Sequence, residues 1–299
     1  MSLTNKIQTI SKSLINEMQL PNDFNKVIEL IYLPLTRQIM NKKSEEPLFI
    51  NINGAQGTGK STLTHFLKHF IEAESGLSVI EISLDDFYST RSEREALAKS
   101  LHPLLLTRGV PGTHDVHLME NTLSNLLQGK VCSVPRFNKA TDDRYTEDQW
   151  KINKRKTDIV LFEGWCNHSP VQSEKELISP INNLESTEDP QGVWRHYANE
   201  QLKDYHKRIF DNADMSIMLK APDFDKIYEW RSLQEDKLRR NTRTSQQSRI
   251  MSPDILKRFI QHYERITRHT LKHLPSRADI VLPIAADHSL DKILKQHDK

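Results

Sequence analysis

Short apolar runs recur along the chain, separated by longer segments with helical periodicity. Apolar runs of four to eight residues are typical of buried strands, and the long intervals can hold the crossovers that parallel strands require. The pattern therefore predicts an α/β fold with a mainly parallel sheet and helices on both faces. The predicted strands are LFINI from Leu48, Ser78 to Leu84, VCSVP from Val131, DIVLFEG from Asp158, SIMLKAP from Ser216 and DIVLPI from Asp279.

The segment after the first of these strands predicts a helix that begins at Lys60 and ends near Gly76. Its apolar residues cover much of the helix circumference, as expected for a helix that packs against a sheet. Glycine is a common residue just past the end of a helix. These apolar positions are Leu63, Phe66, Leu67, Phe70 and Ile71.

Residues 1–45 read as an N-terminal helical extension of one domain that spans residues 1–299. Pro21 and Pro34 punctuate it. It has no continuous apolar core of a signal peptide, and no run in the chain is long enough to cross a bilayer. Apolar residues at helical spacing instead predict an amphipathic helix that packs onto the body: Ile7, Ile10, Leu14, Ile15 and Met18.

Two polar segments interrupt the alternation of strands and helices. Residues 167–210 begin with a polar, proline-containing stretch and are expected to be an insertion. Residues 223–250 are expected to form a lid region that contains the basic segment KLRRNTRTSQQSR at 237–249. That basic segment fits either a lid over a nucleotide or a disordered loop without a role.

Composition narrows the class of protein. The 299 residues carry a formal net charge of only +2, so the chain has no general attraction to nucleic acid or to an anionic membrane. The two cysteines, Cys132 and Cys166, form no CxxC pair, and the histidines form no HExxH motif. A disulfide scaffold and a zincin site are therefore not expected, and a cytoplasmic location fits best.

The sequence GAQGTGKS at 54–61 matches G-x-x-x-x-G-K-[ST] between a predicted strand and a predicted helix. Its glycines permit unusual backbone dihedrals, so that successive amides can point at phosphate oxygens. Lys60 can reach the β- and γ-phosphates, and the Ser61 hydroxyl can bind Mg²⁺. The motif predicts a P-loop for ATP and Mg²⁺. Its expected nucleotide contacts are Gly54, Ala55, Gln56, Gly57, Thr58, Gly59, Lys60, Ser61 and Thr62.

Acidic residues follow two of the predicted strands, where a parallel sheet places its ligand crevice. Glu163 comes directly after four apolar residues and is expected to complete the metal site with Ser61. Asp85 and Asp86 follow the second strand within SLDDFY. Asp85 is predicted to accept the proton of an attacking alcohol, with Asp86 and Tyr88 as acceptor contacts, although one aspartate could instead cap a helix.

The P-loop and SLDDFY together resemble the superfamily of phosphoribulokinase, uridine kinase and pantothenate kinase, in which the carboxylate after the second strand matches Asp85. More of the chain is similar to the D-glycerate 3-kinases of plants, fungi and bacteria. It departs from them at Asn138 and in CNHSP after FEGW, which leaves the acceptor open. The matching segments are LLLTRGVPGTHD (104–115), PRFNKATDDR (135–144), FEGW (162–165), YEWRSLQEDKLR (228–239) and MSPDILKRFIQHYERITRH (251–269).

The resemblance implies a kinase that phosphorylates an alcohol of a small organic acid, D-glycerate above all. A glycerate carboxylate needs a fixed cation, for which Arg108 is the first candidate, followed by Lys139 and Arg144. His114 could bind an acceptor hydroxyl or be an ordinary loop histidine. Arg231, in the predicted lid, is expected to stabilise the transferred phosphoryl group.

Two alternatives stay open on the sequence. One is a kinase of the same class for another metabolite, such as a nucleoside, pantothenate or a different sugar acid. The other is an ATP-dependent switch or assembly protein that acts on a partner. SLDDFY and RGVPGTHD argue against the switch, because a switch needs no acceptor pocket. No nucleic-acid or membrane partner is expected.

Overall fold

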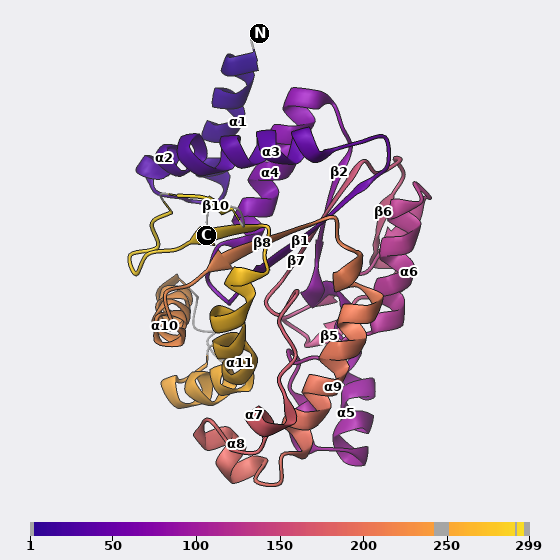
Figure 1. Cartoon of the computed structure of the whole chain (residues 1–299), viewed down its shortest axis with the longest axis vertical. Coiled ribbons are helices and arrows are strands. Elements are labelled where there is room, and N and C mark those ends of the chain that lie inside the picture. Colours follow the sequence, from indigo (N-terminus) through magenta and orange to yellow (C-terminus); the bar gives the residue numbers. More distant parts are fainter. Residues whose placement is uncertain (1–2, 242–250, 291, 296–299) are drawn as a thin grey trace.

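A six-stranded sheet forms the centre of the computed structural model, which describes residues 3–241, 251–290 and 292–295 (Figure 1). The strand order is β10-β9-β8-β1-β7-β2, with all neighbours parallel except the β10–β9 pair. This confirms the predicted, mainly parallel sheet. Its strands are β1 (Leu48–Gly54), β2 (Val79–Ser83), β7 (Ile159–Gly164), β8 (Met215–Lys220), β9 (Ile280–Pro283) and β10 (Leu294–Lys295).

Helices cover both faces of this sheet. Every residue of β1 and β7 is buried, as expected for central parallel strands. On one face pack α1, α3 and α4, and on the other α6 and α9. The helices are α1 (Leu3–Glu17), α2 (Asn25–Val27), α3 (Leu33–Lys42), α4 (Lys60–Ser75), α5 (Arg91–Ser100), α6 (Val116–Leu127), α7 (Glu174–Leu177), α8 (Asn183–Glu188), α9 (Val193–Arg208), α10 (Phe224–Asn241) and α11 (Pro253–His273).

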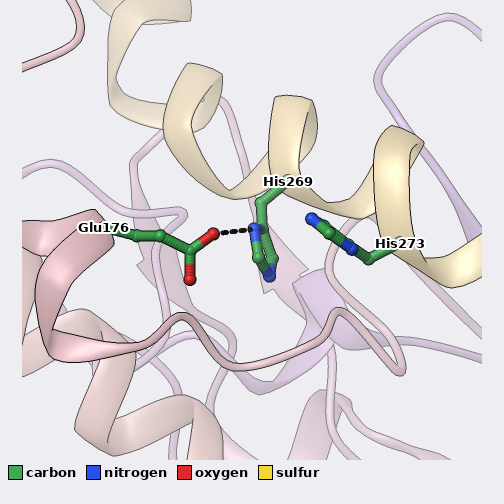
Figure 2. Close-up of side chains that lie close together, drawn as sticks. All are labelled: Glu176, His269 and His273. Carbon is green, nitrogen blue, oxygen red and sulfur yellow. Dashed lines mark ion pairs between the residues drawn. The ribbon is translucent and has the colours of Figure 1, made fainter.

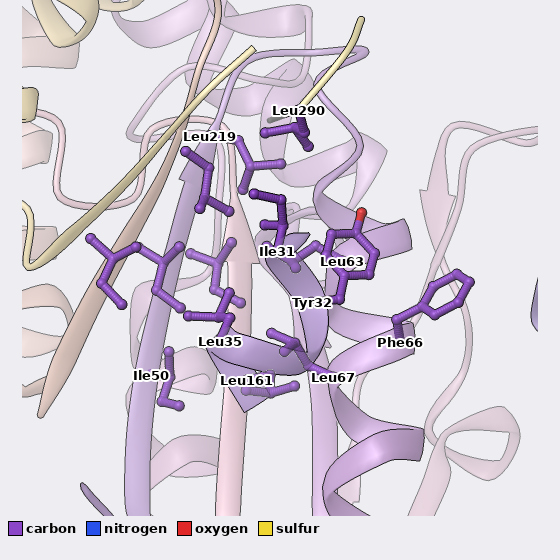
Figure 3. Packing of buried hydrophobic residues seen from close by; sticks show 14 of the residues in the cluster. Ile31, Tyr32, Leu35, Ile50, Leu63, Phe66, Leu67, Leu161, Leu219 and Leu290 are labelled. Carbon is purple, nitrogen blue, oxygen red and sulfur yellow. The ribbon is translucent and has the colours of Figure 1, made fainter. Parts of the chain in front are cut away.

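The larger hydrophobic core lies between the sheet and the N-terminal half of the chain (Figure 3). Strand residues Ile50 and Leu161 meet Leu63 and Leu67 of α4 there, and Leu35 of α3 joins them. All five side chains are fully buried. Helix α4 begins at Lys60 and is followed by Gly76 in the left-handed conformation, as predicted.

The predicted amphipathic helix at the N-terminus is α1, which buries Ile7, Leu14 and Ile15 against this core. Pro34 does not break the following helical segment. It stands at the second position of α3, directly after a π-helical turn at Ile28–Tyr32, and the helix runs on without a break from Asn25 to Lys42. Among the described residues, none of the helices combines the length and apolar character that spanning a bilayer requires.

Three aspartates stabilise the amino-terminal ends of strands, on the side of the sheet opposite the P-loop. The apolar strand patterns did not predict their contacts. Asp158, Asp214 and Asp279 each stand directly before a strand. Their carboxylates accept backbone N–H groups of Ser78, Phe49 and Ser216, each at 2.8 Å. Each aspartate therefore ties the start of its own strand to a neighbouring segment.

The prediction that VCSVP forms a strand of the main sheet is wrong. Its strand, β3 (Cys132–Val134), pairs instead with β6 (Lys151–Asn153) in a separate two-stranded sheet. Only Val134 is buried, so this run lacks the two-sided burial of a central parallel strand. A second small sheet joins β4 (Phe137–Asn138) to β5 (Asp143–Arg144).

The expected insertion at 167–210 contains α7, α8 and α9. Helix α9 buries Leu202 and Tyr205 in the second core, so it serves as the crossover between β7 and β8 and belongs to the α/β body. Of the predicted lid, residues 242–250, including Arg243, lie outside the described residues.

Candidate active site

The P-loop connects β1 to α4. Its glycines are required for two different reasons, backbone conformation and space. Gly57 and Gly59 have φ angles of 80° and 85°, in the left-handed region that favours glycine. Gly54 does not share this conformation, contrary to the sequence prediction. A Cβ there would lie 2.5 Å from Thr58 Oγ1, so Gly54 is required for close packing within the loop.

Lys60 and Ser61, the first residues of α4, face Glu163 at the end of β7. The Ser61 hydroxyl donates to a Glu163 carboxylate oxygen at 3.1 Å. Lys60 Nζ lies 4.0 Å from the other oxygen and donates to the Ala55 carbonyl at 3.2 Å. Strand β7 pairs with β1, so the sheet brings Glu163 to the start of the P-loop helix. Hydroxyl and carboxylate oxygens are the ligands that Mg²⁺ prefers, so this pair fits a magnesium ion.

Asp85 lies two residues after the end of β2, in the turn Leu84–Phe87, and its carboxylate has two polar partners. Its carboxylate accepts from the Tyr88 hydroxyl at 2.8 Å and from Lys139 Nζ at 2.5 Å. Burial on its own would raise the pKa of this carboxyl, but Lys139, Tyr88 and Lys60 together lower the pKa below its ordinary value. Asp85 is therefore ionised at neutral pH and can accept a hydrogen bond or a proton from a third group.

Asp86 has a different environment. It accepts from the Phe137 backbone N–H at 3.2 Å and does not line the cavity described below. Burial raises the pKa of its carboxyl to about 6, an effect that the Phe137 N–H opposes and the Asp85 charge reinforces. The two adjacent aspartates thus differ in charge just below pH 6, where Asp85 is ionised and Asp86 is largely protonated.

We expect Asp86→Asn to stabilise the protein above pH 6. The folded protein holds the Asp86 proton more tightly than the unfolded chain does. The contribution of this residue to stability is therefore fully present below about pH 4 and is lost as the pH rises through 6. The variant should gain up to about 3 kcal/mol at pH 8 and little at pH 4, measured by denaturant unfolding. Equal stabilities at pH 8 would contradict this.

These groups face one cavity of about 430 Å³ at the carboxyl ends of β1, β2 and β7. Donor-side and acceptor-side groups predicted from the sequence come together here, together with aromatic residues from α11. The lining residues are Gln56, Gly57, Lys60, Ser61, Asp85, Tyr88, Arg108, Lys139, Glu163, Trp165, Arg231, Phe259 and Tyr263.

Arg108 enters the cavity wall from the RGVPGTHD loop. Its guanidinium pairs with Asp142 and lies 5.5 Å from the centre of the Phe137 ring. Its carbonyl accepts from the Tyr263 hydroxyl at 3.0 Å. The backbone beside Arg108 is therefore held from α11, and the cation has a defined position.

Trp165 and Tyr263 also line the cavity, although the sequence analysis assigned them no role in the site. The Trp165 indole N–H donates to the Gly109 carbonyl at 2.9 Å. Gly109 has φ 141°, and a Cβ there would lie 2.3 Å from the Tyr263 hydroxyl oxygen. Phe259 stands one helical turn before Tyr263 on α11 and also lines the cavity. Trp165 lies in FEGW, and Phe259 and Tyr263 lie in the 251–269 segment. Membership in these family-matching segments was the sequence signal that could have pointed to the three residues.

His114 and Arg144 lie behind the cavity wall, so the direct acceptor contact suggested for them does not fit this geometry. The His114 ring stacks on Tyr88 at 4.5 Å, and burial lowers its pKa to about 3, which keeps the ring neutral. Arg144 donates to the Tyr88 carbonyl at 3.0 and 3.2 Å and pairs with Asp115 at 3.3 Å. Both residues position Tyr88.

Five of the expected nucleotide contacts are also absent from the cavity lining: Gly54, Ala55, Thr58, Gly59 and Thr62. Thr58 is buried, and its hydroxyl donates to the Ala55 carbonyl at 2.8 Å, which closes the loop on itself. Gly59 gives α4 its left-handed N-cap, and Thr62 lies in the first turn of that helix. Their contribution to phosphate binding would come through the backbone amides rather than side chains.

The sequence has relatives among kinases. A model described as "Phosphoribulokinase / Uridine kinase family" matches residues 49–174. "Uncharacterized kinase mug58" of Schizosaccharomyces pombe is 33% identical over 232 residues, which cover 74% of this chain and 80% of that protein. The chain belongs to the phosphoribulokinase/uridine kinase family. As a member of this family, it is an ATP-dependent P-loop kinase.

Two further comparisons agree with this membership. "Probable ATP-dependent kinase TDA10" of Saccharomyces cerevisiae is 30% identical over 210 residues, or 64% of this chain and 68% of that protein. A solved "D-glycerate 3-kinase" from Cryptococcus neoformans superposes with a TM-score of 0.69 at 21% identity and covers 89% of this chain and 99% of that one. At this identity the structural match shows a shared fold alone.

Proposed function

We propose that this kinase transfers the γ-phosphoryl group of ATP to an alcohol of a small organic acid, D-glycerate above all. The observation that carries the proposal is the composition of the cavity. Lys60 and Ser61 of the P-loop line it together with the Asp85 carboxylate, which is paired with Lys139, and the cation Arg108. An acceptor with both a hydroxyl and a carboxylate matches this arrangement of charges.

In the proposed reaction, the acceptor hydroxyl oxygen forms a bond to the γ-phosphorus as the bond to the β,γ-bridging oxygen breaks. ADP leaves, and the hydroxyl proton passes to the Asp85 carboxylate. Lys60 offsets charge on the phosphates, and Arg231, which lines the cavity from α10, stabilises the transferred group. Ser61 and Glu163 would hold Mg²⁺, which when bound neutralises charge on the phosphate oxygens.

The size of the cavity supports a small acceptor. About 430 Å³ must hold the triphosphate end of the nucleotide as well as the acceptor. Tyr88, Trp165, Phe259 and Tyr263 give the wall aromatic surface that excludes water from the reacting groups. The similarity of the fold to a D-glycerate 3-kinase, and the segments RGVPGTHD and FEGW, favour glycerate over nucleosides and pantothenate.

An acceptor panel tests the proposal. The protein is assayed for ADP release with ATP, Mg²⁺ and one of D-glycerate, L-glycerate, glycerol, glycolate, uridine or pantothenate. We expect D-glycerate to give the highest kcat/KM. A preference for uridine or pantothenate would refute the acid acceptor, and ADP release that no acceptor accelerates would favour the switch.

Arg108→Gln tests the assigned carboxylate contact. Loss of a charged partner in a partly buried site costs about 1.5–3 kcal/mol, so KM for D-glycerate should rise by about 10- to 100-fold. The affinity for ATP should change little. Arg91→Gln is a matched control, because Arg91 pairs with Glu95 at 3.1 Å, is 57% exposed and does not line the cavity. An unchanged KM in Arg108→Gln would remove this residue from the acceptor site.

A further inference from the structure

Two histidines and a glutamate meet at a second place, outside the lining of the kinase cavity (Figure 2). His269 and His273 stand four residues apart on α11, which places their side chains on one face of that helix. Glu176 reaches them from α7. One ligand atom from each residue lies within 4.8 Å of the other two, and this is the one such group of three that the described residues contain.

The distances resemble a set of metal ligands more than a set of hydrogen bonds. Glu176 Oε1 lies 3.4 Å from His269 Nδ1, whereas a hydrogen bond between a charged donor and a carboxylate is about 2.7–2.9 Å long. Two ligands of a tetrahedral zinc ion, each about 2.0–2.2 Å from the metal, stand about 3.3–3.6 Å apart. The carboxylate and the nearer imidazole therefore already have the separation that a shared ion would give them.

The third ligand candidate has no other partner. His273 Nε2 is buried and makes no hydrogen bond among the described residues. A buried ring nitrogen without a partner is costly, and an ion that it binds would remove that cost. The centres of the two imidazoles are 4.4 Å apart, so both rings can turn toward one ion by small side-chain rotations.

The carboxylate is oriented by a surrounding shell. The other oxygen of Glu176, Oε2, accepts from the backbone N–H and the hydroxyl of Ser173, at 2.8 and 2.7 Å. The Glu176 carbonyl accepts from Arg265 of α11 at 2.8 Å. Arg265 in turn pairs with the buried Glu185 at 2.6 Å. Hydrogen bonds of this kind to a carboxylate orient it for metal binding in known sites.

We propose that Glu176, His269 and His273 form a binding site for Zn²⁺ or a similar divalent transition metal that joins α7 to α11. Imidazole ligands favour zinc over magnesium, so the site is chemically distinct from the Ser61–Glu163 pair. Helix α11 also carries Tyr263, whose hydroxyl holds the Arg108 loop. The ion therefore stabilises a helix that contributes to the wall of the kinase cavity. This inference does not depend on the identity of the acceptor.

The chain offers an internal control for this site. His65 and His69 are also four residues apart, on α4, with ring centres 4.4 Å apart and Glu81 3.3 Å from His65. In that pair, however, His69 Nδ1 is bonded to the His65 carbonyl at 2.8 Å, and no set of three ligand atoms comes together. Both histidine pairs thus have a carboxylate beside one imidazole, and they differ in the second imidazole, which joins the ligand set only in the pair on α11.

Zinc binding to the full chain tests the proposal. Metal-free protein is titrated calorimetrically with ZnCl₂ in excess MgCl₂, which occupies oxygen-rich sites. We expect one zinc ion per chain. The double variant His269→Asn/His273→Asn should bind at least about 100-fold more weakly, because loss of a ligand costs no less than loss of a hydrogen bond that orients a ligand. Glu176→Gln should bind about 10- to 100-fold more weakly, while His65→Asn/His69→Asn should retain wild-type affinity.

Two further readouts do not depend on a variant. Zinc at 100 times its Kd should raise the Tm of the wild-type protein by about 5–10 °C. Cobalt(II) at the same site should give the visible absorption of a four-coordinate ion. Absence of zinc binding would overturn the proposal, as would equal affinity in the wild type and His269→Asn/His273→Asn. Loss of binding in His65→Asn/His69→Asn alone would also overturn it.

Discussion

Replacement of Lys60 by alanine is expected to lower kcat/KM for ADP release by at least about 100-fold, because it removes the P-loop cation that lies beside the Glu163 carboxylate in the cavity. Lys60 Nζ lies 4.0 Å from Glu163 and lines the cavity beside Ser61. A fixed positive charge at the transferring phosphates contributes several kcal/mol to the transition state and less to the bound substrate. The measurement is steady-state ADP release with ATP and D-glycerate.

Lys68→Ala is the matched control for this variant. Lys68 stands on the same helix, pairs with Glu81 at 3.7 Å and does not line the cavity, so its loss should leave kcat/KM within about twofold of the wild type. Similar thermal unfolding of both variants would show that the fold is retained. If Lys60→Ala kept the activity of Lys68→Ala, the phosphate-binding role of Lys60 would be wrong.

Asp85→Asn is expected to lower kcat by about 100- to 10,000-fold and to leave the affinity for ATP unchanged. The variant keeps the size of the side chain and an oxygen for Tyr88 or Lys139, but it cannot take a proton from the acceptor. In the wild type, Lys139 and Tyr88 hold the pKa of Asp85 below its ordinary value, so its carboxylate is ionised at neutral pH and can accept a proton. ADP release and ATP binding measured on the same protein separate the two effects.

Asp211→Asn serves as the control, because Asp211 is 63% exposed, pairs with His206 and does not line the cavity. It should retain wild-type kcat. A kcat for Asp85→Asn within tenfold of the wild type would exclude Asp85 as the proton acceptor and leave it a positioning role.

Local patterns predicted the parts of the site that lie at the ends of strands. The P-loop, Asp85 and Glu163 each follow an apolar run, and parallel pairing of β2, β7 and β1 brings those ends together. Their proximity follows from the fold class alone. Register and side-chain direction were not needed for this part of the prediction.

Contacts between distant segments could not be predicted in the same way. The Tyr263 hydroxyl meets the Arg108 carbonyl across 155 residues, and the Trp165 indole meets Gly109 across 56. Neither pairing leaves a periodic signal in the sequence. The placement of His114 behind Tyr88, rather than in the cavity, also depends on how the RGVPGTHD loop packs against Tyr205.

The reasons for the P-loop glycines could also be predicted only in part from the sequence. The P-loop motif indicates that Gly54, Gly57 and Gly59 matter, but only the backbone angles show that two need a positive φ and one needs space beside Thr58. The strand VCSVP was misplaced for a related reason, since three residues do not distinguish a buried strand from a strand with one buried residue.

The central claim is that this kinase phosphorylates an acid in the cavity that Asp85 and Arg108 share. The most direct test is mass spectrometry of the acceptor after incubation with ATP and Mg²⁺, for the wild type and Asp85→Asn side by side. We predict that the wild type converts D-glycerate to a monophosphorylated product with one ADP released per product, and that Asp85→Asn forms almost none. ADP release without a phosphorylated acid, or equal product from both proteins, would contradict the account.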